Sequence, residues 1–453
     1  MRFFPFMTRD RWFYSRLLAI AVPVALQNLI NFGVSMSDTV MVGMLGEVQL
    51  SAVALANQLS FIFIITTFGI AGGSNVMIAQ FWGKSDIASI HKVQAVMYRL
   101  IIVVALIFTC IAFFFSRQVL SIYSTDPLVI EEGAKYLRIV GISYILFGLT
   151  STTVVTLRSV GVVRISLAVY ISSLCISVFL NWVLIFGNLG FPAMGVEGAA
   201  TSTAIARVAE LVIVLVYMLA IERKIHFKLR YLFLRKIGVL REFLKNAGPV
   251  VANELLWVLG ATTVAAIIGR MGTEVVAANS INGVIFQLVC ITLFGASNAA
   301  AAIIGNTIGE GQYEKAREYG NSLLFISICL GFIACGLIHV LKYPMLSLYN
   351  VSDTVYAYAV QIININSVLV ILTSVPIMAI VGVLRGGGDT RFALLMDVLF
   401  LWAISIPLGF ITGLWLGWPV PVVYIIIKSD ELFKSIFCAI RILRGKWIHD
   451  VTR

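Results

Sequence analysis

Four polar side chains recur on one face of the first apolar stretch of the chain: Gln27, Asn31, Ser35 and Asp38. Their spacing places them within a sector about 80° wide on a helix. A charged side chain in hydrocarbon costs at least about 2.5–3.5 kcal/mol, so this face must meet a partner helix or an aqueous cavity. A carboxylate held there suits a group that takes up and releases a proton. The alternative is that Asp38 lies near the external end of its helix and is simply hydrated.

The second half of the chain carries its own acid in an apolar stretch. Glu254 lies beside Asn253 and one turn before Trp257. A glutamate with an indole nearby is a candidate site for a proton or a cationic substrate, because cation–π attraction is available. A hydrogen-bonded structural glutamate is the competing interpretation. Asp397 has no clear partner near it in the sequence and is a third candidate.

Two further polar groups contain both signs of charge, and we interpret them as structural pairs. In the first, Arg207 and Glu210 are spaced to neutralise each other and share a helix face with Thr203. The second group comprises Lys428, Asp430, Glu431 and Lys434. The four histidines lack ligand spacing, so no metal site is predicted. No nucleophile–base pattern is readable, so the chain is not expected to be an enzyme.

The composition excludes a soluble domain. Sixty percent of the residues are apolar and only 12% are charged, whereas soluble domains carry about 25% charge. Apolar stretches near the roughly 20 residues that cross a bilayer fill most of the chain. We predict twelve membrane-spanning helices, at about 17–39, 51–77, 95–115, 134–157, 165–187, 196–220, 247–269, 278–305, 320–341, 356–384, 392–414 and 418–440.

Backbone-defining residues recur at a fixed separation in the two halves of the chain. Pro23 and Pro249 are 226 residues apart, and the Leu-Arg-x-x-Gly-x-x-Arg motif of residues 157–164 returns at residues 384–391. The chain is therefore predicted to be an all-α polytopic membrane protein. Its two six-helix bundles would be related by a pseudo-two-fold axis along the membrane normal. Two such halves are typical of transporters that open alternately to either side.

The net charge of +11 is explained by where the basic residues lie relative to the predicted membrane spans. With both termini in the cytoplasm, most Lys and Arg residues fall in cytoplasmic segments, which is the positive-inside bias, so a nucleic-acid partner is not expected. The predicted domains are an N-lobe at 1–220, a basic linker at 221–246, a C-lobe at 247–441 and a cytoplasmic tail at 442–453. The linker is predicted to form an interfacial helix on the anionic leaflet, with a solvated linker as the alternative.

Nothing in the sequence predicts a nucleotide-driven pump or a cofactor. The loops are short, and Gly83-Lys84-Ser85 lacks the earlier glycine of a P-loop, which would fall at Ile78. The six cysteines form no C-x-x-C motif, so neither a metal site nor a disulfide framework is expected. Transport is therefore expected to draw on an ion gradient.

Four segments resemble motifs of the multidrug and toxic compound extrusion (MATE) family. The first runs from Ala21-Val22-Pro23 to Phe32-Gly33-Val34-Ser35-Met36-Ser37-Asp38-Thr39-Val40-Met41-Val42-Gly43. The others are Leu180–Gly187, Gly195–Ala200 and Leu384–Arg391. The resemblance extends over essentially the whole chain, and the order and spacing of the segments make it specific.

The resemblance implies a bacterial-type antiporter that expels organic cations and other amphipathic compounds in exchange for H⁺ or Na⁺. Asp38 would be the carboxylate of the first lobe that binds the coupling ion, with Ser177, Asn181 and Thr203 as its neighbours. We expect a multi-pass plasma-membrane protein with cytoplasmic termini. It would work as a monomer among membrane lipids, on small organic substrates.

In the second lobe the chain departs from some members of the family. Those members place a glutamate in helix seven where this chain has Trp257, and here the acid comes one turn earlier, at Glu254. An ion or substrate site in this lobe is therefore expected around Glu254, with Asn253 and Asp397 as further candidates.

Two other classes of transporter remain open. A flippase for lipids or lipid-linked oligosaccharides has a similar topology but tends to need a cavity rich in Arg and Lys for a pyrophosphate. The intramembrane cations Arg207, Lys428 and Lys434 each have an acid nearby, which disfavours this class. A major-facilitator transporter predicts the same helix count, but its loop between helices two and three normally carries Asp-Arg, unlike residues 83–86.

Overall fold

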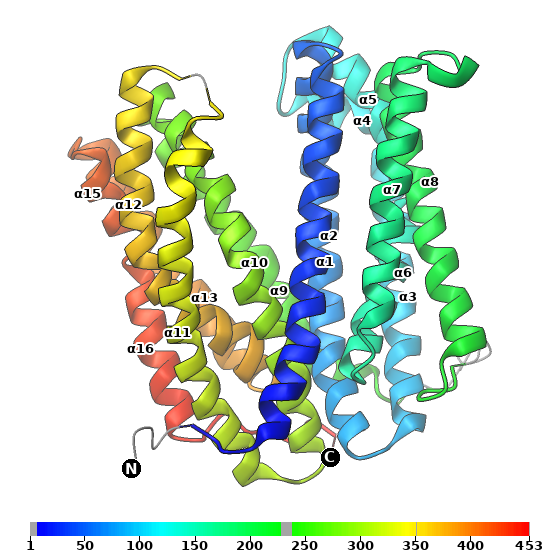
Figure 1. Ribbon diagram of the computed structural model, residues 1–453, viewed down its shortest axis with the longest axis vertical. Coiled ribbons are helices and arrows are strands. Elements are labelled where there is room, and N and C mark those ends of the chain that lie inside the picture. Colours follow the sequence, from blue (N-terminus) through cyan, green and yellow to red (C-terminus); the bar gives the residue numbers. More distant parts are fainter. Residues whose placement is uncertain (1–6, 228–237, 350, 453) are drawn as a thin grey trace. The chain divides into compact units, whose positions relative to one another are not determined.

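The computed structural model describes residues 7–227, 238–349 and 351–452, and within these ranges it consists of helices and short connections without a strand (Figure 1). Ten of the described helices are long and apolar enough to cross a membrane. The predicted all-α polytopic fold is therefore confirmed.

The described residues of the first half of the chain form eight α-helices and two short segments of other helical type. The α-helices are α1 (Arg11–Gly43), α2 (Glu47–Gly83), α3 (Ile87–Phe114), α4 (Ser116–Ser121), α5 (Pro127–Ile142), α6 (Tyr144–Ser159), α7 (Arg164–Phe186) and α8 (Gly195–Val216). The short segments are the 3₁₀-helix η1 (Asn188–Gly190) and the π-helix η2 (Tyr217–Ile221).

In the described part of the second half there are a further eight α-helices and three π-helical segments. The α-helices are α9 (Leu240–Gly269), α10 (Thr273–Gly309), α11 (Tyr313–Leu346), α12 (Asp353–Pro376), α13 (Thr390–Phe400), α14 (Ile406–Phe410), α15 (Val420–Ile427) and α16 (Asp430–Leu443). The π-helices are η4 (Ile377–Leu384), η5 (Leu401–Ser405) and η6 (Ile411–Trp415).

Two of the twelve predicted spans are divided between shorter helices. The fourth consists of α5 and α6, which are bent by 47° at Ser143. The twelfth consists of α15 and α16, which are interrupted at Lys428 and Ser429. Proline marks a change of geometry in the tenth span, where Pro376 ends α12 and η4 continues it. By contrast, α1 and α9 run through Pro23 and Pro249 as α-helices.

The chain divides into two compact units, which we treat separately. Unit 1 comprises Met1–Ala25, Asn75–Ser85 and Gly248–Arg453, and unit 2 comprises Leu26–Ser74 and Asp86–Ala247. The start of α1 and the end of α2 therefore belong to the unit formed mainly by the second half of the chain.

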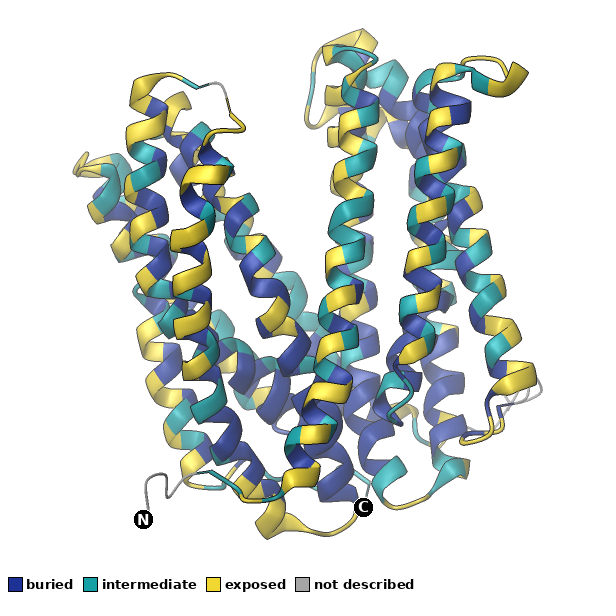
Figure 2. Ribbon diagram, in the orientation of Figure 1, coloured by how far each residue is buried: buried dark blue, intermediate teal, exposed yellow. Residues whose placement is uncertain are grey.

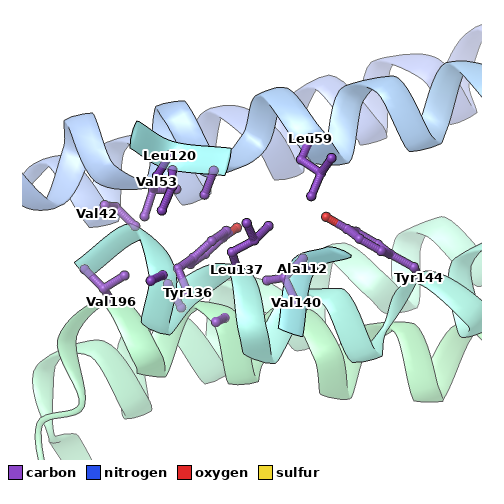
Figure 3. Close-up of a cluster of buried hydrophobic side chains, with 14 of the residues drawn as sticks. Val42, Val53, Leu59, Ala112, Leu120, Tyr136, Leu137, Val140, Tyr144 and Val196 are labelled. Carbon is purple, nitrogen blue, oxygen red and sulfur yellow. The ribbon is translucent and has the colours of Figure 1, made fainter. Parts of the chain in front are cut away.

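The core of unit 2 is apolar and includes Tyr136 and Tyr144 (Figure 3). Tyr144 stacks on Phe63 with ring centroids 4.7 Å apart, and its hydroxyl meets that of Ser60 at 2.9 Å. Tyr136 is buried in the same cluster beside Leu137. A buried tyrosine normally finds a polar partner for its hydroxyl, so this core brings polar groups close to apolar packing.

The core of unit 1 also contains a polar set among apolar side chains. Asn282 donates to the hydroxyl of Tyr424 at 3.0 Å and accepts from the amide of Asn366 at 3.1 Å. Large apolar residues stay exposed on the helices, for example Phe332 and Val340 on α11 (Figure 2). Lipid would cover such side chains in a membrane protein.

The chain after α16 packs back onto unit 1. Trp447 is fully buried against Gly387, where an added Cβ would come 2.3 Å from the indole. The backbone amide of His449 donates to the carbonyl of Gly387 at 2.8 Å. Glycine is therefore required at position 387 for the tail to lie this close.

The same tail contacts the end of α2. The Gln80 amide donates to the carbonyl of His449 at 3.0 Å and accepts from the backbone N–H of Val451 at 2.9 Å. Lys84 forms an ion pair with Asp450 at 3.0 Å. The tail thereby joins the end of α2 to the loop after η4 within unit 1.

The basic linker is described only at its ends. Its first residues return to unit 2, where His91 meets the carbonyl of Ile225 at 2.8 Å and Phe227 packs edge-on against Tyr98. Residues 228–237 lie outside the described residues, and with them the centre of the predicted interfacial helix. Residues 240–246 form the beginning of α9.

Candidate ion-coupling site

The central contact of unit 2 joins an acid and an amide from two spans. Asn181 of α7 donates through Nδ2 to the Oδ1 atom of Asp38 on α1 at 2.5 Å. Asn181 is 1% exposed, and its own Oδ1 atom has no partner among the described residues. Asp38 likewise has no other hydrogen bond in the described part of the chain. The resemblance led us to expect these two residues together, and the structure places them in contact.

The other residues expected near Asp38 contribute to the surroundings rather than to the contact. Ser177, one turn before Asn181, is buried, and its carbonyl accepts from Ser202 at 3.1 Å. The Thr203 hydroxyl is tied to the carbonyl of Ala199 at 3.1 Å. Neither side chain has a direct bond to the carboxylate among the described residues.

One further neighbour was not anticipated from the sequence. Tyr136 of α5 is buried and lies close enough to interact with both Asp38 and Thr203. Its position inside an apolar helix gives it the pattern of an ordinary core tyrosine, so no local signal in the sequence marks it as part of a site.

The residues of the polar stripe on α1 lie in different environments. Gln27 is buried and its Oε1 atom lacks a partner among the described residues. Asn31 is half-buried, whereas Ser35 is exposed. The stripe therefore runs from a buried end at Gln27 to an accessible middle, and Asp38 beyond it is half-buried.

Beside Asp38 lies a self-contained charged pair. Arg207 and Glu210 on α8 form an ion pair at 2.9 Å, and Ser173 of α7 donates to the same glutamate at 2.5 Å. The guanidinium also lies over the ring of Phe147, 4.6 Å from its centre. The predicted structural pairing of Arg207 with Glu210 is thus present in the structure.

In unit 1 the acids are paired with cations. Arg385 forms an ion pair with Glu254 at 2.7 Å and donates to Oδ1 of Asn253 at 2.8 Å. The Nδ2 atom of Asn253 then donates to Asp397 at 2.8 Å. Asn253 therefore links Arg385 to a second acid, Asp397, which lies 144 residues after the asparagine in the chain.

The network continues to the last span. Lys434 pairs with Asp397 at 3.0 Å and with Asp430 at 2.8 Å, and its side chain is only 3% exposed. Asp397, which lacked a partner near it in the sequence, is thus bonded to Asn253 and Lys434. Lys434 was expected to pair within its own helix, and the structure adds the contact with α13.

Arg385 was missed as a site residue because the predicted tenth span ends at 384. A usable signal existed, since Arg385 belongs to the repeated Leu-Arg-x-x-Gly-x-x-Arg motif. Trp257 stands apart from the network, with 41% of its surface exposed. No cation of the described ranges lies over this indole, and its predicted cation–π contact with a cationic substrate stays a prediction.

The arrangement offers no cage for a multivalent metal. Across residues 7–227, 238–349 and 351–452, no three His, Cys, Asp or Glu side chains converge. What the site can do is hold one monovalent cation or proton at Asp38, next to a neutral amide.

Comparison with known proteins gives the family. The MatE family profile matches residues 23–183 and 249–411, one match in each half of the chain. The uncharacterized transporter YisQ of Bacillus subtilis (strain 168) is 25% identical over 434 residues, covering 95% of this chain and 94% of the relative. The probable multidrug resistance protein NorM of Agrobacterium fabrum is 27% identical over 437 residues, covering 90% of each.

Solved structures agree at the level of the fold. A multidrug resistance MATE family transporter of the MOP superfamily, in an outward-facing conformation, aligns with a TM-score of 0.86 at 17% identity, covering 97% of this chain and 99% of that one. A MOP superfamily transporter of Pyrococcus furiosus aligns with a TM-score of 0.86 at 16% identity and the same coverage. Two family matches covering most of the chain, with relatives along nearly its full length, show that this multi-pass membrane protein belongs to the MATE family of transporters.

Proposed function

We propose that the protein is a secondary antiporter that exports organic compounds, cationic or amphipathic, in exchange for H⁺ or Na⁺ by alternating access. The observation that carries the proposal is the contact between Asp38 and Asn181. Among the described residues, Asp38 is an acid of a membrane span whose hydrogen-bond partner is neutral.

A neutral partner matters because of the energetics of a charge in the membrane. A carboxylate paired with a fixed cation keeps its compensation throughout a transport cycle. A carboxylate held only by an amide must recruit a cation from solution whenever water leaves it. Asp38 would therefore bind its ion on one face of the membrane and release it on the other as access alternates.

The second lobe has a different proposed role. Glu254 is paired with Arg385, so a cationic substrate can compete with the guanidinium for this carboxylate. Trp257, exposed one turn further on α9, offers an aromatic face to such a cation. We assign Glu254, Trp257 and Asn253 to substrate binding and Asp397 to the support of this network.

The remaining features of the proposal follow from the family and from the charge pattern. The relatives named multidrug resistance proteins support small organic substrates for this chain. The basic segments between spans support cytoplasmic termini in a plasma membrane. We propose a monomer as the working unit, because each chain contains both halves of the repeat.

The test is efflux of a cationic dye from proteoliposomes with an imposed pH or Na⁺ gradient. We expect Asp38→Asn to abolish gradient-driven efflux, and Glu254→Gln to weaken the dye's apparent affinity while the ion dependence stays. Asp126→Asn is the matched control, because the same substitution at an exposed helix cap outside the spans should leave efflux unchanged. Undiminished efflux from Asp38→Asn would refute the assignment. Binding of a polyisoprenyl pyrophosphate, without dye transport, would favour the flippase instead.

A further inference from the structure

Among the described charged residues of unit 2, Glu210 is the most enclosed. It is 1% exposed, and it accepts hydrogen bonds from Ser173 at 2.5 Å and from Arg207 at 2.9 Å to each oxygen. Burying a carboxylate this deeply is costly, and its bonds to Ser173 and Arg207 offset that cost. Both carboxylate oxygens of Glu210 are therefore engaged by the guanidinium of Arg207.

Arg207 lies within electrostatic reach of a second acid, Asp38. The guanidinium instead bonds to Glu210 and packs on Phe147. Asp38 keeps only the neutral Asn181 as its hydrogen-bond partner in the described part of the chain. One cation thus interacts with two acids, and its hydrogen bonds go to the acid that is not the proposed ion site.

The sequence repeat provides an internal comparison. At the separation of 227 residues found for the Leu-Arg motif, Arg207 corresponds to Lys434 and Glu210 corresponds to Phe437. Unit 1 therefore has the cation without the acid one turn later. There, Lys434 pairs with Asp430 of its own helix at 2.8 Å and also with Asp397 of a neighbouring span at 3.0 Å. A cation at this position can therefore pair with an acid of a neighbouring span even while it holds an acid of its own helix.

We infer that Glu210 is a positioning residue, which holds Arg207 away from Asp38 and so keeps the Asp38 carboxylate open to the coupling ion. The inference rests on the proposed role of Asp38. The charged and titratable groups that interact with Arg207 and Glu210 of α8 are Asp38 from α1, Tyr136 from α5 and Tyr170 from α7. Arg207 is the positive charge among them that can compete with an incoming cation.

The expected effect of freeing Arg207 has a definite sign. A cation that moves to within 4–6 Å of a carboxylate favours its ionised form by about 10- to 1000-fold. Asp38 would then bind H⁺ or Na⁺ less readily, because its charge is already compensated. The concentration of the coupling ion that gives half-maximal efflux should therefore rise, while the rate at saturating ion should be largely retained.

The experiment compares Glu210→Gln with the double variant Glu210→Gln/Arg207→Gln in the dye efflux assay, at a series of pH values and Na⁺ concentrations. We expect the single variant to need at least about tenfold more coupling ion. The double variant should return close to the wild type, because the competing cation is gone. Removing both charges of a buried pair can also restore stability, so the readout that separates the two roles is the coupling-ion concentration at half-maximal efflux. A change in the stability of the fold alone would not shift that concentration.

Ser173→Ala provides a variant that keeps both charges, and it should produce a smaller shift in the same direction. An unchanged ion requirement in Glu210→Gln and Ser173→Ala, with Asp38→Asn inactive, would overturn the inference but leave the proposed function standing. A double variant that is no closer to the wild type than Glu210→Gln would overturn it too. Full activity of Asp38→Asn would instead remove the proposed function on which the inference rests.

Discussion

The replacement Lys434→Met tests the charged network of unit 1. Lys434 is almost completely buried and pairs with both Asp397 and Asp430. At N–O distances of 2.8–3.0 Å and an effective dielectric constant of about 20, each pair is worth about 5–6 kcal/mol of gross Coulomb energy. Desolvation of the charges offsets much of this. Removing one partner of a buried pair is nevertheless measured to cost about 3–5 kcal/mol, because the other charge is left without compensation.

We therefore expect Lys434→Met to lower the free energy of unfolding by about 3–5 kcal/mol, measured by denaturant titration in detergent micelles. The triple variant Lys434→Met/Asp397→Asn/Asp430→Asn should regain most of that loss, because no charge then stays unpaired. The amide at position 397 can still accept from Asn253. The matched control Lys315→Met, at an exposed position of α11, should change stability by less than about 0.5 kcal/mol. If the triple variant were less stable than Lys434→Met, the reasoning about unpaired charge would be refuted.

Two further predictions concern the C-terminal tail of unit 1. Gly387→Ala should destabilise the protein by about 1–3 kcal/mol in the same titration, because its Cβ would meet the buried Trp447 ring, whereas Gly336→Ala, with open space around it, should not. Burial opposes ionisation of Asp450, but hydrogen bonds from Thr452 and Lys84 outweigh it and lower its pKa to about 2. The stability from this depressed pKa is present above the usual pKa of about 3.8 and is lost as pH falls toward 2, so Asp450→Asn should flatten the stability profile in that window; an unchanged profile would contradict this.

The helical frame could be predicted because hydropathy and the repeat act locally along the chain. The bend between α5 and α6 could not be placed, since apolar residues lie on both sides of Ser143. The break at Lys428 and Ser429 was not predicted because the charged residues there were interpreted as pairs within one continuous helix. The contact of Asp38 with Asn181 followed only from the family resemblance. The two residues are 143 positions apart, and neither spacing nor composition predicts a contact over such a distance in the sequence.

For the charged network of unit 1, the sequence indicated several of the residues but not the contacts between them. Glu254, Asn253 and Asp397 were named as candidates, but the residue that connects the first two, Arg385, lay just beyond a predicted span. The π-helical continuation of α12 through η4 carries that arginine to its partners. Similarly, nothing in the composition of the tail indicates that Trp447 is buried, because its cavity is created by glycines distant in the sequence, at 320 and 387.

The most direct test of the central claim is substrate-dependent ion movement in proteoliposomes. With dye loaded on one side and no imposed ion gradient, the wild type should move H⁺ or Na⁺ in the opposite direction, in proportion to the dye exported. Asp38→Asn should show no dye-dependent ion movement, while Asp126→Asn should behave as the wild type. Dye-dependent ion movement of normal size in Asp38→Asn would contradict the account.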